Sequence, residues 1–166
     1  MREGTISYLF GCHHFFFHPL FVLIAWVKLY RRWPKPWQLV CIFLHDIGHI
    51  GKDYLSHYEE KKRHWELGAR IAYQLFGEKG YNLVAGHTNS SGFKRSMMYL
   101  PDKYSWLEAW NWWLESNRIF EPKIRQAATV KEFLEGVREE KRTGNKNGNH
   151  YIYLMAQEKK DEKSHR

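Results

Sequence analysis

The sequence predicts a single all-α domain, in which helices surround one core. The chain has 166 residues, a one-domain length that buries enough surface to fold without a disulfide framework. Apolar residues recur with helical spacing in several segments, whereas strand-like alternation is weak. Apolar residues make up 43% of the chain and charged residues 27%, which excludes a wholly disordered chain and a low-complexity fibre.

Proline and glycine separate the expected helices. Pro34 and Pro36 divide the first from the second, and Pro101 suits a first helical turn because its missing N–H would be unpaired there anyway. Residues 48–60 and 88–94 are rich in glycine or polar residues and are expected as connectors. Six helices are expected, near residues 15–30, 37–47, 62–76, 79–87, 101–117 and 122–141.

The first expected helix raises the question of a membrane span, because residues 15–27 are almost continuously apolar. A spanning helix needs about 20 apolar residues, and the wider window here contains His13, His14, His18 and Pro19. No small-residue cleavage site of a secretory signal follows the apolar run. We therefore expect a helix buried on all sides and no stable membrane insertion.

Cysteine content and charge restrict the compartment and the partners. Cys12 and Cys41 are too few for a disulfide framework, and neither lies in a C-x-x-C pair. We expect buried thiols in a reducing, cytoplasmic compartment. The net charge of +8 favours anionic partners, namely phosphorylated metabolites, nucleic acid or a membrane surface, without choosing among them.

Five of the expected helices carry a His or Asp at the end of an apolar stripe. A buried polar group without a partner costs about 1–3 kcal/mol. A lone core histidine is usually satisfied by a hydrogen bond, but five coincidences favour one or two metal ions as the shared partner. The candidate ligands are His18, His45, Asp46, His64, His87 and Asp102.

The other histidines are assigned from their sequence surroundings. His57 and His150 lie in polar surroundings, and His165 belongs to the C-terminal tail, so all three are expected to be solvated. His13 and His14 precede the first helix and could approach the site, but they do not share the stripe of His18. The expected stripe of the second helix is Trp37, Val40, Cys41 and Leu44, and that of the third is Leu67, Gly68, Ile71, Ala72 and Leu75.

In the order of these ligands, the chain resembles the HD-domain metal-dependent phosphohydrolases. Residues 43–48 (FLHDIG) look like the core motif of that superfamily, and residues 64–72 (HWELGARIA) resemble the third-helix segment of members that hold two metals. Residues 86–92 and 99–103 are similar to the corresponding strings of bacterial HD-type diadenosine tetraphosphate hydrolases. The resemblance covers about residues 13–120.

The resemblance implies an HD-domain helical bundle with a metal site at its centre. It implies that His18, His45, Asp46 and Asp102 hold one metal ion, and that His64 and His87 hold a second with Asp46 bridging. A His and carboxylate set without thiolate suits Fe, Mn, Co, Ni or Zn and disfavours Ca. The implied reaction is hydrolysis of a phosphate ester or anhydride, in a nucleotide, by a metal-activated water.

Four further residues are expected to meet substrate phosphate. Lys52 follows the motif on the connector, Arg95 follows the polar loop, and Lys103 adjoins Asp102. His49 stands where many family members carry a lysine, so it is expected to donate to a phosphate or a leaving group. For each basic residue, a solvated surface charge is the alternative.

Other functions stay open at this point. A di-iron HD-type oxygenase uses the same ligand order, and hydrolysis without oxygen in the presence of Mn or Co would distinguish the hydrolase. A basic nucleic-acid-binding or regulatory domain with a vestigial site is the second alternative, against which the complete ligand set argues. The favoured partner is a phosphorylated small molecule; nucleic acid is less favoured, and a homodimer is compatible with the exposed tryptophans expected among Trp106, Trp110, Trp112 and Trp113.

The C-terminal residues lack an apolar anchor. Residues 143–149 are rich in Gly and Asn, and residues 158–166 are mostly charged. Neither stretch can offset an ordering cost of about 1–2 kcal/mol per residue. We expect residues 1–142 to form the functional domain and residues 143–166 a linker and charged tail, so that a chain cut after Met155 keeps its metal and its turnover.

Overall fold

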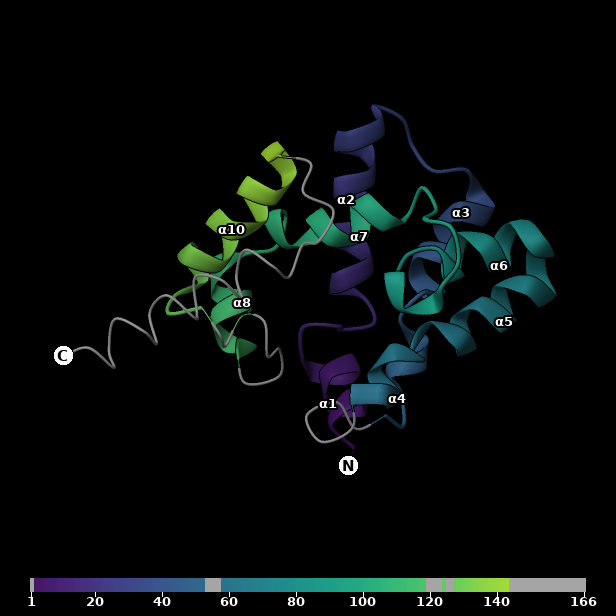
Figure 1. Cartoon of the computed structure of the whole chain (residues 1–166), viewed down its shortest axis with the longest axis horizontal. Helices are drawn as coiled ribbons and strands as arrows, with labels where there is room; N and C mark the ends of the chain where they lie inside the picture. Colours follow the sequence, from purple (N-terminus) through teal and green to yellow (C-terminus); the bar gives the residue numbers. More distant parts are fainter. Residues whose placement is uncertain (1, 53–57, 119–123, 125–126, 144–166) are drawn as a thin grey trace. The chain divides into compact units, whose positions relative to one another are not determined.

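A computed structural model describes residues 2–52, 58–118, 124 and 127–143, and the fold within these ranges is all-α, as predicted (Figure 1). The chain separates into two compact units, Met1–Ala109 and Trp110–Arg166. The boundary expected after residue 142 falls at the edge of the described ranges and stays a prediction. His57, His150, His165 and the expected tail lie outside them.

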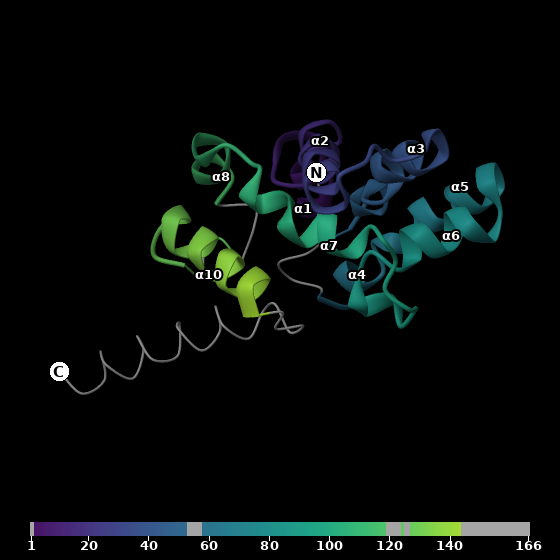
Figure 2. The ribbon, with the colours of Figure 1, turned by 90° about the horizontal axis from the view of Figure 1, so that it is seen from above.

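The first unit contains most of the helices, and the second contributes two in the described ranges. Helices α5 and α6 lie side by side as a hairpin that turns at Gly77, which both views of the ribbon show (Figures 1 and 2). In chain order the first unit comprises α1 (Glu3–Phe10), α2 (Phe17–Tyr30), α3 (Pro36–Leu44), the 3-10 helix η1 (Ile47–His49), α4 (Tyr58–Lys62), α5 (Trp65–Phe76), α6 (Glu78–Ala85), η2 (Asn89–Ser91), α7 (Tyr99–Tyr104) and η3 (Ser105–Leu107). The second comprises α8 (Asn111–Ser116) and α10 (Val130–Thr143).

The core of the first unit lies between α2, α3, α5 and α6. Its largest member is Trp26 of α2, which is fully buried and packs with Val22, Ile42 and Met98. Cys12 and Cys41 are both buried free thiols, as predicted. This core fixes the ends of four helices, and five of the six candidate ligands lie at or next to those ends, while Asp102 comes from α7.

Two expected apolar stripes are confirmed only in part. Cys41 of α3 and Gly68 and Ala72 of α5 are buried, as predicted. Val40 and Leu67, which were expected in the stripes, are exposed, whereas Gln38, Ile42 and Ala69 beside them are buried. The reason is the close approach of α5 to the end of α3, where a Cβ on Gly68 would lie 2.4 Å from the Leu44 carbonyl oxygen. Only small residues fit on that face, so the leucines of α5 point outward.

Helix α2 was expected to be buried on all sides, but it is buried along one face only, since Lys28 is exposed and the residues beside it are half-buried. The fold also departs from the expected helix bounds. The helix expected at 101–117 is divided into α7, η3 and α8: the Ser105 hydroxyl donates to the Asp102 carbonyl at 2.6 Å, and Trp110 is extended. The last helix begins only at Val130, because the Thr129 hydroxyl accepts from the Glu132 N–H as an N-cap.

Helices α1 and α4 were not expected from the sequence. The buried residues of α1 are Gly4, Ser7 and Tyr8, which are small or polar and give no apolar periodicity. Helix α4 begins inside the expected connector and ends at Lys62, where the third helix was expected to start. Among the described residues, no helix combines the length and the apolarity that a membrane crossing requires.

Candidate metal centre

The six candidate ligands converge on one buried position inside the first unit. His45 caps the C-terminus of α3 and Asp46 follows it, so both lie where the chain turns into η1. His64 immediately precedes α5 and is half-buried, and His87 follows α6, so the α5–α6 hairpin presents both from the same end. His18 comes from the first turn of α2 and Asp102 from α7.

One carboxylate oxygen of Asp46 belongs to a first group of donors. Asp46 Oδ2 lies 3.1 Å from His18 Nε2 and 3.4 Å from His45 Nε2. The Asp102 carboxylate closes the group, with Oδ1 3.2 Å from His18 Nε2 and 3.6 Å from His45 Nε2. His18, His45 and Asp102 therefore form one cluster whose ligand atoms all lie within 4.8 Å of one another, and Asp46 Oδ2 lies beside its two imidazoles.

The other oxygen of Asp46 belongs to a second group. Asp46 Oδ1 lies 3.7 Å from His64 Nε2 and 3.7 Å from His87 Nε2. The two Nε2 atoms are 3.0 Å apart. Asp46 is therefore shared between two donor groups, one on each of its oxygens.

Backbone carbonyls fix the orientation of three of these imidazoles. The Nδ1–H groups of His45, His64 and His87 each donate to the carbonyl three residues earlier, all at 2.6 Å. In the neutral form of each ring, the proton on Nδ1 leaves a lone pair on Nε2, which is the atom that faces Asp46. Two neutral rings with lone pairs 3.0 Å apart, as in His64 and His87, are mutually repulsive unless a cation lies between them. The donor set therefore fits a divalent transition metal.

The second donor group is held in the form that binds a metal. Burial, together with the charges of His49 and the neighbouring His87, holds the pKa of His64 well below its usual range. Burial and the charge of His45 lower the pKa of His87 to about 4. Both rings are thus neutral at pH 7, and a metal need not displace a proton from either.

In the first donor group the pKa values of the imidazoles are raised rather than lowered. Burial alone would lower the pKa of His45, but the charge of Asp46 and hydrogen bonds to Asp102 and Asp46 raise it to about 10. The pKa of His18 is raised as well, since its hydrogen bonds to Asp102 and Asp46 outweigh burial. The buried carboxylates thus favour the charged form of both imidazoles in the metal-free protein, and a metal ion would take over that positive charge.

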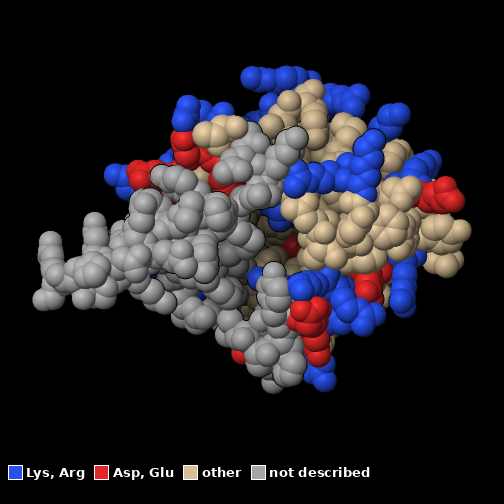
Figure 3. Space-filling model, viewed as in Figure 1, with Lys and Arg blue, Asp and Glu red and all other residues tan. Residues whose placement is uncertain are grey.

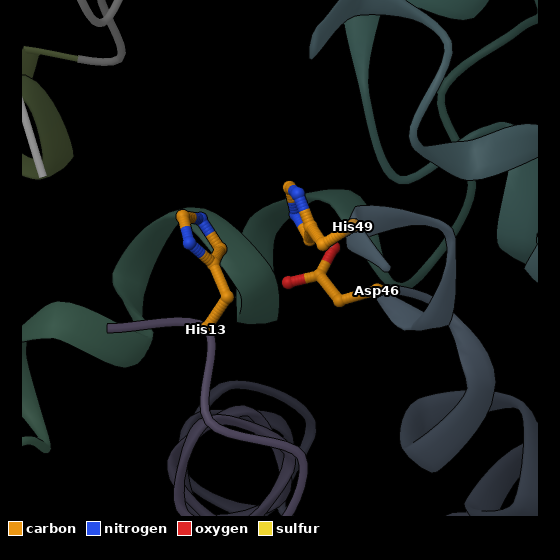
Figure 4. Close-up of side chains that lie close together, drawn as sticks. All are labelled: His13, Asp46 and His49. Atoms are coloured by element: carbon orange, nitrogen blue, oxygen red, sulfur yellow. The ribbon is translucent and has the colours of Figure 1, made fainter. Parts of the chain in front are cut away.

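His49 and His13 also lie against Asp46 (Figure 4). His49 Nε2 is 3.3 Å from Asp46 Oδ1, and its ring stacks on that of His64 with centroids 4.6 Å apart. The ring of His13 lies 4.2 Å from that of His49. Sequence reasoning placed His49 near the phosphate but did not assign His13, because His13 precedes α2 and is off its stripe.

His14, its neighbour, has a structural role. Its Nδ1 accepts from the backbone N–H groups of Phe16 and Phe17, at 3.2 and 3.4 Å, and so caps the start of α2. Its ring also stacks on Phe15.

The three expected phosphate-binding cations differ in how close they lie to the ligands. Lys103 Nζ is 3.4 Å from Asp102 Oδ2, and the side chain is half-buried. Arg95 is exposed, where its guanidinium lies 4.2 Å from the Tyr99 ring centroid and its Nε donates to Asn89. Lys52 is half-buried, and its carbonyl accepts from Gly4 N–H of α1 at 2.8 Å. Other Lys and Arg side chains are spread over the part of this unit that Figure 3 shows.

Comparison with known families gives one match. The family model named HD domain matches residues 15–139, which is more than half of the chain. No curated protein and no solved structure matches the chain. The matched range contains all six candidate ligands, whereas α1 and His13 precede it.

Proposed function

The chain belongs to the HD domain family, which consists mainly of metal-dependent phosphohydrolases, and on that basis we propose that it hydrolyses a phosphate ester or anhydride of a nucleotide. One observation carries the proposal. Asp46 Oδ2 lies against His18 and His45, which also contact Asp102, and Asp46 Oδ1 lies near His64 and His87. Such a shared carboxylate is the arrangement expected of a two-metal hydrolytic site.

Hydrolysis would need different contributions from the bound metal, from the residues that hold it and from the residues around them. Bound divalent metal would supply Lewis acidity, which lowers the pKa of a water and neutralises phosphoryl oxygens. The carbonyl-anchored imidazoles hold their Nε2 atoms in place, so the site needs little reorganisation on binding. Lys103, beside Asp102, would add a positive charge for the phosphate.

A nucleotide is the favoured substrate for two reasons. The charge of +8 attracts a polyanion. Trp106 provides an aromatic ring next to the ligands, with its centroid 6.2 Å from that of His18, where a base could stack. The substrate is therefore expected to combine phosphate groups with an aromatic base. The cytoplasmic location and the homodimer stay predictions.

A panel of nucleotides incubated with the protein in the absence of oxygen tests the proposal. With Mn or Co we expect phosphate release from at least one nucleotide. The Asp46→Ala variant should be inactive, because both donor groups lose a carboxylate oxygen. A matched control is Glu108→Ala, which removes a carboxylate that pairs with Lys28 outside the donor groups. Turnover only with iron and oxygen would contradict hydrolysis and favour the oxygenase branch, and the absence of turnover on every phosphate ester and anhydride would refute the proposal.

A further inference from the structure

Helix α1 is held against the segment that carries His49. The Gly4 N–H donates to the Lys52 carbonyl at 2.8 Å, and the Gly51 N–H donates to the Thr5 hydroxyl at 2.8 Å. The fit is close, because a Cβ on Gly4 would lie 2.5 Å from the His49 carbonyl oxygen. The N-terminal residues, which precede the matched family range, are therefore built into the wall of the metal centre.

His13, in the loop between α1 and α2, faces the centre from this wall. Its Nδ1 forms a hydrogen bond of 2.9 Å with the hydroxyl of Ser7, a buried residue of α1. One ligand atom from each of His13, Asp46 and His49 can be chosen so that all three lie within 4.8 Å of one another. Figure 4 shows the imidazoles of His13 and His49 close to the Asp46 carboxylate, with His13 coming from the segment before α2 and His49 from the same segment as Asp46.

Ring orientation separates this group from the second donor group. The rings of His49 and His64 are inclined by only 14° and are stacked. Because the lone pair of an imidazole lies in the plane of its ring, two stacked and nearly parallel rings cannot direct their lone pairs at one ion. The rings of His13 and His49 are inclined by 37°, so their donor atoms can converge.

We propose that His13, Asp46 and His49 form a third cation position, which the N-terminal segment of this chain adds to the centre. Two imidazoles and one carboxylate are the donor set of three-ligand sites that keep a coordination position open. The position is expected to be the weakest of the three. It shares its carboxylate with the second donor group, and ions already bound beside it would repel another cation.

Metal titration of the full-length protein tests this directly. Metal-free protein is titrated with Co²⁺, and the bound equivalents are measured by mass spectrometry after equilibrium dialysis. We expect three equivalents in the wild type, the last with the lowest affinity, and two in His13→Gln with the tight equivalents unchanged. The matched control is His14→Asn, which keeps an acceptor for the α2 N-terminus and should bind three.

A second variant keeps the test informative if His13→Gln does not fold. Ser7→Ala removes a hydroxyl that forms a hydrogen bond with His13, and loss of such an outer partner typically weakens metal affinity by about 10–100-fold. That loss should be confined to the third equivalent. A wild type that saturates at two equivalents, or a His13→Gln variant that still binds three, would overturn the third position while leaving the two-group centre intact. A wild type that binds no metal would refute the centre itself, and with it the proposed hydrolysis.

Discussion

The Gly48→Ala substitution is expected to damage the second donor group and to spare the first. Gly48 lies in η1, two residues after Asp46, and its backbone passes directly over the carbonyl of His64. A Cβ at this position would lie 1.7 Å from the His64 carbonyl oxygen and 2.7 Å from its carbonyl carbon. The obstacle is backbone rather than a flexible side chain, so rotation of a side chain cannot relieve the overlap.

The size of the effect follows from that overlap. Real Cβ atoms essentially never approach closer than 3.0 Å, so η1 and the His64 backbone must separate by about 1.3 Å, the difference between 3.0 and 1.7 Å. Binding geometry tolerates displacements of about 0.5 Å. We expect a loss of stability of about 1–3 kcal/mol from overpacking. We also expect metal affinity at the Oδ1 side of Asp46 to fall by about 10–100-fold, as when an outer contact of a ligand is lost.

Thermal unfolding and metal titration measure the two effects separately. A loss of 1 kcal/mol lowers the Tm of a chain of this size by roughly 2–4 °C. Gly80→Ala is the matched control, because its Cβ would lie 2.5 Å from the Ala72 carbonyl oxygen in the α5–α6 contact, away from the ligands. It should lower the Tm and keep the metal content. If Gly48→Ala binds as much metal as the wild type with equal affinity, the packing argument for His64 is wrong.

Three other predictions follow from the described contacts. His64→Ala should lower the number of tightly bound metal ions and leave the group around His18 loaded, which metal analysis measures; a variant with the wild-type metal content would contradict the second donor group. Lys103→Met should raise KM at low salt more than Arg95→Met does, because Lys103 lies 3.4 Å from Asp102 whereas Arg95 is exposed over Tyr99. High salt should reduce the difference in KM between the two variants. Equal effects of the two variants on KM would mean that the phosphate lies elsewhere. Burial raises the pKa of the Cys41 thiol to about 11, so little thiolate is present at pH 8 and it accumulates only as the pH approaches 11. Cys41 should therefore react with a thiol reagent roughly 100-fold more slowly than a thiol of pKa 9. Rapid labelling of Cys41 in the folded protein would refute this prediction.

The all-α fold could be predicted from the sequence because apolar periodicity and helix-breaking residues act over short stretches of the chain. Apolar periodicity marks α2, α5 and α6, and the prolines mark the start of α3. The order of the ligands could also be predicted, since each stands at or next to a helix end. The prediction that they share a metal rested on their similar positions at the ends of apolar stripes. The structure brings the six side chains together around Asp46, and the shared metal stays a prediction.

The remaining features depend on contacts that no local pattern encodes. Helix α1 buries Gly4 and Ser7, so its inward face has no apolar period. His13 approaches Asp46 only because the loop after α1 folds back onto η1. The outward leucines of α5 reflect the close approach at Gly68, which depends on α3, a helix distant in the sequence.

The central claim is that Asp46 bridges two metal-binding groups, and anomalous diffraction from crystals grown with Mn²⁺ tests it most directly. We predict one anomalous peak within about 2.0–2.3 Å of Asp46 Oδ2, His18 and His45, and another at the same range from Asp46 Oδ1, His64 and His87. Peaks only at sites remote from Asp46, or a single peak that leaves His64 and His87 without metal, would contradict the account.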